Sequence, residues 1–305
     1  MSINEHRQIY FSAPAIKKFS ASNFSNLQKK DFVGISITGE DCSLNCQHCN
    51  SRLLKFMIPA TTPDSFEKKC SNLIRNGTKG FLITGGCDIE GKLPINPFVS
   101  VLERIKNKHS VKMIFHTRLV DERLAKNLHD IRADAVLLDV AGSENTFNNI
   151  YNLQGKTIED EIRSLNLLIR YNLPIAPHIV VGINYGKLDG EFNALKILKG
   201  IDFKTLVLVV FTPLKKTPMA EVAPPILNEV IDFFEQTRRY FPDTSITLGC
   251  ARPAGKYQVA LEKKALELNF AGIAFPSEET IEFCQQNDYK IHYSYFCCSI
   301  ADLGI

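Results

Sequence analysis

Short apolar runs alternate with amphipathic stretches from residue 33 to residue 276, and this order constrains the fold more than any other feature of the chain. The intervening stretches, such as residues 65–77, repeat apolar residues with the period of an α-helix. Strands that alternate with helices predict β/α units around a parallel sheet. Eight units predict an α/β fold of the closed (β/α)8 TIM-barrel type, with an open doubly wound sheet as the alternative. The eight runs are VGISIT (33–38), GFLIT (80–84), VKMIFHT (111–117), AVLLDVAG (135–142), PIAPHIVVG (174–182), LVLVVFTP (206–213), SITLGC (245–250) and FAGIAFP (270–276).

The whole chain is expected to form a single domain, because no Pro/Gly/Ser-rich linker or low-complexity tract divides residues 1–305. Residues 1–32 would be an N-terminal extension, and residues 33–276 would carry the barrel strands. Residues 277–305 would hold the last helix and a cysteine-bearing tail that closes over the barrel mouth.

Composition narrows the possible partners and the compartment. Hydrophobic residues make up 45% of the chain and charged residues 23%, as in soluble globular proteins. The net charge of +3 is too small to favour nucleic acid or a membrane as a partner, and no apolar run is long enough for a signal peptide or a membrane span. We therefore expect a cytoplasmic protein, whose nine cysteines are metal ligands or catalysts rather than disulfides.

Three of these cysteines, Cys42, Cys46 and Cys49, form a C-x3-C-x2-C run just after the first predicted strand. A barrel places the residues that follow its strands on the active face. Three thiolates can hold three irons of a [4Fe–4S] cluster and leave the fourth iron free for a ligand with an amine and a carboxylate, such as S-adenosylmethionine (SAM). A zinc site completed by His48 and a structural cluster with a distant fourth cysteine remain open.

The C-x3-C-x2-C run resembles the signature of the radical SAM superfamily, whose members are built on β/α barrels. The resemblance implies that the three cysteines bind a [4Fe–4S] cluster and that SAM binds the free iron. An electron from the cluster would then cleave SAM and yield a 5′-deoxyadenosyl radical. An aromatic residue often precedes the last cysteine in the family, and this chain has His48 there.

Glycines after the second predicted strand resemble a second family segment. Thr84, Gly85 and Gly86 match the glycine-rich stretch whose backbone pairs with the methionyl amine of SAM. The family often has Glu after the glycines, whereas this chain has Cys87. Without the cysteine loop before it, the Gly-Gly pair would indicate only a turn.

Further strand ends carry groups that could hold the rest of SAM. Asp139 could accept hydrogen bonds from the ribose hydroxyls, or serve in capping or packing. His178 could line the adenosine pocket, or be a core histidine with its hydrogen bonds satisfied. Residues 211–219 resemble a loop of biotin-synthase-like enzymes that lies near adenine and substrate, although Lys215 and Lys216 there could be a solvated charge pair.

A second group of thiols occupies the last third of the chain. Cys250 ends the seventh predicted strand, and Cys297 and Cys298 stand next to each other in the tail. A returning tail could bring the pair to Cys250, where the three would ligate an auxiliary iron–sulfur cluster. A redox-active pair or a zinc site are the alternatives, and Cys284 is expected to be a buried apolar residue of a helix.

Several segments together resemble archaeal biotin-synthase-related radical SAM proteins, some of which look like components of a two-protein lipoyl synthase. The segments are TGGCDIEGKLP, FHTRLVDE, FTPLKKTPM, GCARPAGKY and the terminal Cys-Cys. The resemblance implies a sulfurtransferase of lipoate biosynthesis that inserts sulfur at C6 and C8 of a protein-bound octanoyl chain. Its partners would be an octanoylated lipoyl-carrier protein, a second radical SAM component and an electron donor such as ferredoxin.

Other functions remain open at this point. One is a biotin-synthase-like insertion of sulfur into a small molecule, because that enzyme's auxiliary cluster uses an arginine and Arg252 stands beside Cys250. Another is a radical isomerase or methyltransferase, which would need no second cluster. The last is a non-enzymatic cluster carrier, which need not cleave SAM.

Overall fold

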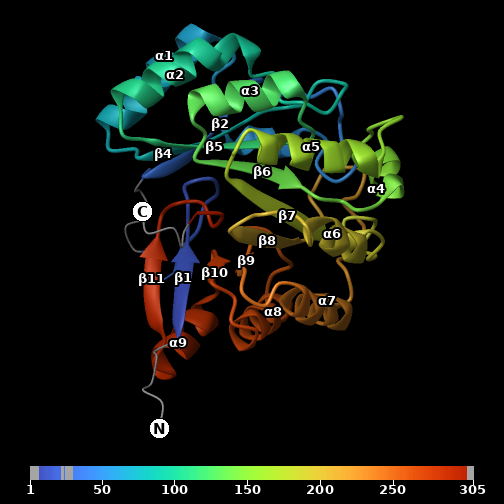
Figure 1. The fold of residues 1–305 in the computed structure, drawn as a ribbon. Helices are drawn as coiled ribbons and strands as arrows, with labels where there is room; N and C mark the ends of the chain where they lie inside the picture. The colour runs from blue at the N-terminus through green and yellow to red at the C-terminus, as the bar shows by residue number, and fades with distance from the viewer. Residues whose placement is uncertain (1–6, 22–23, 25–29, 301–305) are drawn as a thin grey trace.

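The computed structural model describes residues 7–21, 24 and 30–300. These residues form one sheet of eleven strands in the order β11-β1-β10-β9-β8-β7-β6-β5-β4-β2-β3, and every strand pair is parallel. Figure 1 shows that the sheet curls, with the helices on its outer side. The strands are β1 (Gln8–Ser12), β2 (Phe32–Ser36), β3 (Ile58–Pro59), β4 (Gly80–Thr84), β5 (Lys112–Thr117), β6 (Ala135–Asp139), β7 (Ile175–Val181), β8 (Thr205–Val210), β9 (Ser245–Leu248), β10 (Gly272–Ala274) and β11 (Lys290–Ser294).

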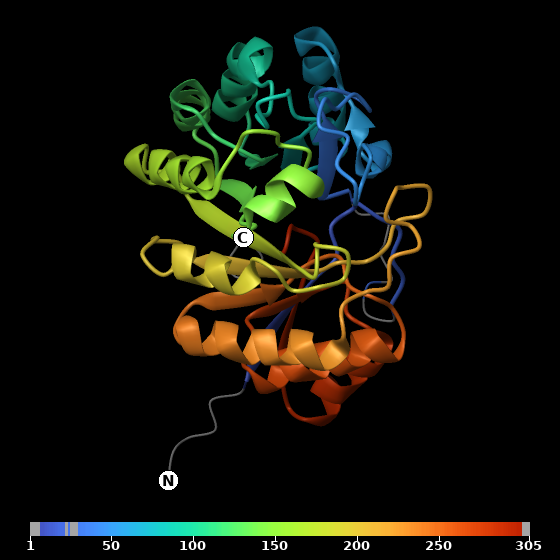
Figure 2. The ribbon, with the colours of Figure 1, turned by 90° about the vertical axis from the view of Figure 1, so that its right-hand side faces the viewer.

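The helices alternate with the strands as the apolar pattern indicates, and Figure 2 shows them around the outside of the curl. In the described residues, no helix is both long enough and apolar enough to cross a membrane. The α-helices are α1 (Pro63–Arg75), α2 (Val99–Lys108), α3 (Glu122–Ile131), α4 (Glu144–Asn149), α5 (Ile158–Arg170), α6 (Glu191–Leu198), α7 (Leu227–Tyr240), α8 (Lys256–Glu267) and α9 (Glu278–Gln286), with short 3-10 turns η2 (Arg52–Phe56) and η3 (Asn96–Phe98).

Helix α1 illustrates how the sequence sets these elements. The Thr62 side chain accepts a hydrogen bond from the Ser65 amide at 3.2 Å, and Pro63 occupies the first turn, where its missing N–H costs nothing. Phe66 and Cys70, one turn apart, are fully buried against the sheet. Cys70 is therefore a core residue.

All eight predicted strands are present, as β2 and β4 to β10, and they lie side by side in chain order. A closed ring of eight strands is not shown. The curled sheet has β11 at one end and β3 at the other, and a single parallel bridge between Ala15 and Val33 joins the segment after β1 to β2. The sheet therefore forms a partly open barrel of TIM type.

Three strands, β1, β3 and β11, extend the sheet beyond the predicted eight. Strand β1 comes from the predicted N-terminal extension and pairs with both β10 and β11, so this extension is part of the sheet. Parts of the extension (residues 1–6, 22–23 and 25–29) and the last residues of the tail (301–305) lie outside the described residues.

The described tail lies inside the curl of the sheet. Residues 296–300 are all buried, and the Phe296 ring packs on Phe32 with ring centroids 5.7 Å apart. A Cβ added to Gly80 would lie 3.1 Å from Phe296, so this ring sits at the amino ends of β2 and β4. The tail follows the carboxyl end of β11, and the prediction that it closes over the barrel mouth stays a prediction. Its apolar Phe296 and Ile300 are buried in the core.

Strand register brings polar side chains onto one face of the sheet. Asp139 pairs with His178, and His116 pairs with Leu137, two residues before Asp139. Paired residues of a parallel sheet point to the same side, so His116, Asp139 and His178 share a face. The neighbouring Phe115 and Leu138, which point the other way, are fully buried. Because helices cover the outer side, the shared face is the inner one.

Candidate cofactor site

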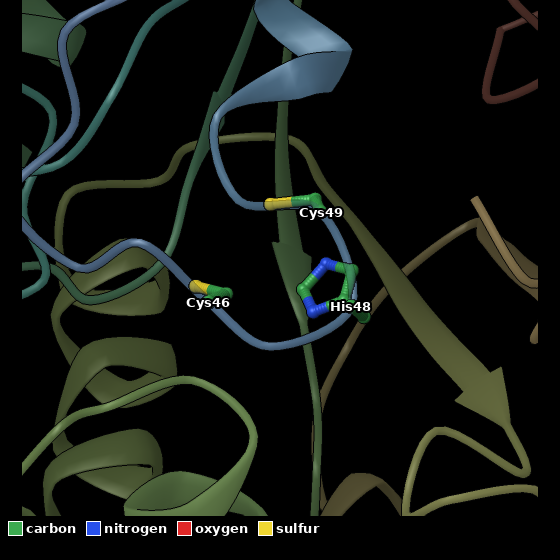
Figure 3. Close-up of side chains that lie close together, drawn as sticks. All are labelled: Cys46, His48 and Cys49. Atoms are coloured by element: carbon green, nitrogen blue, oxygen red, sulfur yellow. The ribbon is translucent and has the colours of Figure 1, made fainter. Parts of the chain in front are cut away.

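The cysteine loop connects β2 to η2 and turns sharply between its last two cysteines. The Cys49 and Asn50 amides both donate to the Cys46 carbonyl, at 3.2 and 2.8 Å. Asn45, Asn50 and Ser51 have φ between 43° and 60°, a region that Asn reaches more readily than most residues. This turn brings the ligand atoms of Cys46, His48 and Cys49 within 4.8 Å of one another. Figure 3 shows the three side chains gathered on the loop.

The thiols of this loop share a proton. A hydrogen bond between Cys46 and Cys49 raises the pKa of Cys46 well above its ordinary value and lowers the pKa of Cys49 to about 4. Cys42 lies outside the group within 4.8 Å but interacts electrostatically with Cys46. Thiolates of a [4Fe–4S] cluster bind separate irons, so the third sulfur need not lie within the span of one ion. The donor set fits an iron–sulfur cluster, and the Nδ1 of His48, buried without a hydrogen-bond partner in the described structure, keeps the zinc alternative open.

The loop after β6 holds the cysteine loop in place. The Asn152 side chain donates to the carbonyls of Leu44 and Asn45 at 2.8 and 2.9 Å. The loop after β6 is itself fixed by Glu161 of α5, whose carboxylate accepts from the amides of Ala141 and Gly142 at 2.8 and 3.1 Å. Burial raises the pKa of Glu161.

The glycine segment after β4 packs directly on the cysteine loop. A Cβ on Gly86 would overlap the backbone of Asp41 and lie 2.5 Å from the Cys42 Cβ. The Gly86 amide donates to Thr38 Oγ1 at 2.7 Å, and the Thr84 hydroxyl donates to the His116 carbonyl at 2.9 Å. The cysteine loop therefore leaves no room for a side chain at position 86. The Gly86 amide is already engaged in a hydrogen bond within the protein.

Arg118, just after β5, was not assigned from the sequence. It is 5% exposed, its guanidinium carbon lies 3.6 Å from the centroid of the Tyr151 ring, and its Nη1 donates to the Asp139 carbonyl at 2.6 Å. Its Nε and Nη2 have no hydrogen-bond partner in the described structure. Burial would lower the pKa of Arg118, but electrostatic interactions with Tyr151, Asp139 and Glu161 raise it.

A buried cation with open N–H groups is costly unless a negative group binds it. Arg118 interacts electrostatically with Cys46, so its free donors lie near the cysteine loop. A carboxylate ligand would satisfy them through charge-assisted hydrogen bonds. The sequence signal that could have revealed Arg118 is its place at a strand end, in FHTRL.

The structure brings Asp139 and His178 together with His116 on the inner face. His116 Nε2 lies 3.3 Å from Asp139 Oδ1, and the two histidine rings stack with centroids 5.6 Å apart. Burial would raise the pKa of Asp139, but His116 and Arg118 outweigh it and hold this pKa well below its usual range. Burial lowers the pKa of His178 to about 4, so its ring is neutral near neutral pH.

Cys250, Cys297 and Cys298 also come together. Cys250 interacts electrostatically with both tail cysteines. A hydrogen bond between Cys297 and Cys298 lowers the pKa of Cys297 to about 6 and raises the pKa of Cys298. The Ser299 hydroxyl also donates to Cys297, at 3.2 Å. The tail thus reaches the end of β9.

The other sequence candidates are not part of these groups, although Arg252 interacts electrostatically with Cys250. Cys284 is fully buried on α9, as expected. Lys215 and Lys216 are exposed on the loop after β8. Arg252 is buried, forms an ion pair with Glu262 and donates to the carbonyls of Gly249 and Phe275. The Arg252 side chain is therefore engaged in structural hydrogen bonds, which argues against a role as a metal ligand.

Comparison with solved structures shows the fold. HydG, a maturase of the [FeFe]-hydrogenase, gives a TM-score of 0.63 at 13% identity and covers 98% of this chain and 66% of its own. Methylornithine synthase (PylB) gives 0.54 at 12%, covering 88% and 72%. Streptococcus suis SuiB bound to S-adenosylmethionine gives 0.54 at 12%, covering 79% and 58%. No curated protein matches the chain.

The sequence pattern of the Radical SAM superfamily matches residues 36–210, which is more than half of the chain and includes the cysteine loop, the glycine segment and strands up to β8. The family implies a [4Fe–4S] cluster and SAM as cofactors, and the cysteine loop supplies the thiols for that cluster. This chain belongs to the radical SAM superfamily.

Proposed function

We propose that this enzyme is a lipoyl-synthase-like sulfurtransferase, which inserts sulfur into an octanoyl chain attached to a carrier-protein lysine. The observation that carries the proposal is the second group of thiols, Cys250, Cys297 and Cys298, gathered inside the curled sheet. A radical isomerase or methyltransferase has no need of such a group. A source of sulfur close to the radical site does need one.

The first cofactor site would bind SAM through residues on both sides of the cysteine loop. Cys42, Cys46 and Cys49 would hold the [4Fe–4S] cluster. Arg118, the buried cation with two unpaired nitrogens, would receive the SAM carboxylate, and the Tyr151 ring packed on its guanidinium would exclude water. When bound, cluster and SAM supply the 5′-deoxyadenosyl radical that removes a hydrogen atom from an unactivated carbon.

The second site would hold the auxiliary cluster that supplies sulfide. Cys297 and Cys298 are adjacent in sequence, so they would serve two irons of one cluster, and Cys250 would serve a third. Arg118 donates to the Asp139 carbonyl, Asp139 lies 3.3 Å from His116, and His116 interacts electrostatically with Cys297 of the second group. A substrate carbon would have to lie between the radical source and the sulfur source.

The partners follow from the substrate. An octanoylated lipoyl-carrier protein would present its acyl-lysine arm at the carboxyl ends of the strands, where radical chemistry takes place in a barrel of this type. A second radical SAM component would perform the other sulfur insertion, and a donor such as ferredoxin would reduce the first cluster. All of these would meet the enzyme in the cytoplasm.

The test is incubation of the enzyme with SAM, a strong reductant and an octanoyl-lysine peptide, with mass spectrometry of the peptide. We expect a peptide that has gained sulfur together with 5′-deoxyadenosine. The matched variant Cys297→Ala/Cys298→Ala should still release 5′-deoxyadenosine but leave the peptide without sulfur. A variant that still adds sulfur would contradict the role of these thiols, and transfer only to a free small acid would favour the biotin-synthase-like reaction.

A further inference from the structure

His48 stands between Cys46 and Cys49 in the cysteine loop and lies close to both thiols in space. One of its ring nitrogens lies within 4.8 Å of the Sγ atoms of both cysteines, and Figure 3 shows the ring beside them. Within the part of the chain that the structure describes, no other histidines, cysteines or acidic residues gather in this way. A cluster held by the two thiols would therefore lie next to the His48 ring.

The His48 ring has hydrogen-bonding capacity that the protein itself does not use. Its Nδ1 is buried, and it has no hydrogen-bond partner in the described structure. Buried polar atoms in proteins nearly always have a partner, so a buried ring nitrogen without one indicates that a bound group supplies the hydrogen bond. An iron–sulfur cluster is such a group, because its sulfur atoms accept hydrogen bonds.

We propose that His48 donates a hydrogen bond from its ring to a sulfur atom of the [4Fe–4S] cluster in the cysteine loop and thereby raises the reduction potential of that cluster. Hydrogen bonds to the sulfur atoms are one of the means by which a protein sets this potential. They favour the reduced cluster, which carries one more negative charge than the oxidised cluster. The inference concerns the first cofactor site alone and does not depend on the second group of thiols.

Tyr151 fixes the position of the His48 ring. The two rings meet edge to face, with centroids 5.4 Å apart and planes at 81°. Tyr151 is itself 3% exposed, and the Arg118 guanidinium carbon lies 3.6 Å from the centroid of its ring. The Tyr151 carbonyl also accepts a hydrogen bond from the Cys46 thiol at 3.5 Å. A buried aromatic residue thus holds His48 beside the sulfur atoms.

Direct binding of a zinc ion by His48 is the alternative. Zinc takes cysteine and histidine ligands, and Cys46, His48 and Cys49 could supply three of its four. Such a site would leave Cys42, which lies outside the group within 4.8 Å, without a role. The Radical SAM pattern covers residues 36–210 and so includes all three cysteines of the loop, which favours a cluster with His48 as a hydrogen-bond donor.

The test compares side chains at position 48 in full-length Cys297→Ala/Cys298→Ala protein, so that a second cluster cannot contribute a signal. His48→Phe keeps an aromatic ring against Tyr151 and removes both ring nitrogens. His48→Asn and His48→Gln each keep an N–H, close to the position of Nδ1 or of Nε2. A redox titration of the anaerobically reconstituted cluster, followed by electron paramagnetic resonance, measures the reduction potential.

We expect His48→Phe to lower the equilibrium constant for one-electron reduction about tenfold, which is a shift of about 59 mV to lower potential. His48→Asn or His48→Gln should restore most of this loss, and every variant should keep its iron. Pulsed electron paramagnetic resonance of the protein with His48 should show a weak coupling to nitrogen. The coupling should change when the protein is made with 15N-histidine, and it should be absent from His48→Phe.

Several results would overturn the inference. Equal potentials with His48 and with His48→Phe would remove the hydrogen bond, and a loss that neither His48→Asn nor His48→Gln restores would assign the effect to packing. A strong coupling from a directly bound nitrogen, or a tightly held zinc that His48→Phe releases, would make His48 a metal ligand. If His48→Phe prevents cluster assembly, His48→Leu provides the same comparison with a smaller side chain that has no donor.

Discussion

Phe296, in the C-terminal tail, packs its ring on Phe32, the first residue of β2, with ring centroids 5.7 Å apart at 47°. The contact ties the end of the chain to the strand that leads into the cysteine loop. A chain terminus is usually mobile unless something holds it. In this protein the tail is part of the core, and it carries two of the predicted ligands with it.

Replacing Phe296 should destabilise the fold and disturb the second group of thiols. We expect Phe296→Ala to lower the free energy of unfolding by about 3–5 kcal/mol, because the ring is 7% exposed and its removal leaves a cavity. Phe56→Ala is the control, since that ring is 64% exposed and its loss should change the free energy by less than about 0.5 kcal/mol. Chemical denaturation of both variants measures the difference, and equal midpoints would show that the tail is not part of the core.

Gly86→Val should remove the first cluster rather than merely weaken SAM binding. The added side chain would overlap Asp41 and Cys42 and push a cluster ligand out of position. Gly200→Ala is the matched control, because nothing lies within 4 Å of the Cβ it would add. Iron content and the visible spectrum of anaerobically reconstituted protein report the result. A Gly86→Val protein with a complete first cluster would mean that the close packing at Gly86 is not needed.

Arg118→Met should weaken SAM binding by about tenfold to a hundredfold, since hydrogen bonds to a charged group contribute about 1.5–3 kcal/mol. Methionine keeps much of the buried volume and lacks the two unpaired nitrogens. Equilibrium dialysis with SAM measures the affinity, and the iron content should stay unchanged because Arg118 is no cluster ligand. Unchanged SAM affinity would remove Arg118 from the cofactor site.

In metal-free protein, the cysteines of the first site should differ in reactivity. The pKa of Cys49 is lowered to about 4 by its hydrogen bond with Cys46, so Cys49 is a thiolate at every pH above that value. Burial raises the pKa of Cys87 to about 12, which keeps it a thiol near neutral pH. Brief alkylation at mildly acidic pH, followed by peptide mapping, should label Cys49 and spare Cys87. Faster labelling of Cys87 would contradict this assignment.

The sequence predicted the strands that alternate with helices along the chain. It missed strands such as β1, whose partners lie far away in the sequence. The apolar runs of β2 and β4 to β10 alternate with helical stretches, so a local pattern reveals them. Strand β1 pairs Tyr10 with Gly272 and with His292, and no pattern within residues 8–12 indicates partners so distant.

The sequence could indicate those candidate residues that are selected by their place at the end of a strand. The rule that strand ends carry the site was enough to select Cys250 and Asp139 as candidates. The importance of Arg118 depends on its burial, and the pairing of His116 with Asp139 depends on strand register. Neither burial nor register can be read from neighbouring residues alone.

The measurement that tests the account most directly is the iron and sulfide content of Cys297→Ala/Cys298→Ala beside the unchanged protein. This double variant keeps Phe296 and Ile300, whose removal by truncation would also disturb the core. The account predicts about eight irons and eight sulfides in the unchanged protein and about four of each in the variant, because one [4Fe–4S] cluster is lost. Reductive cleavage of SAM should survive in the variant. A variant that keeps the full iron and sulfide content would contradict the auxiliary cluster, and with it the proposed insertion of sulfur.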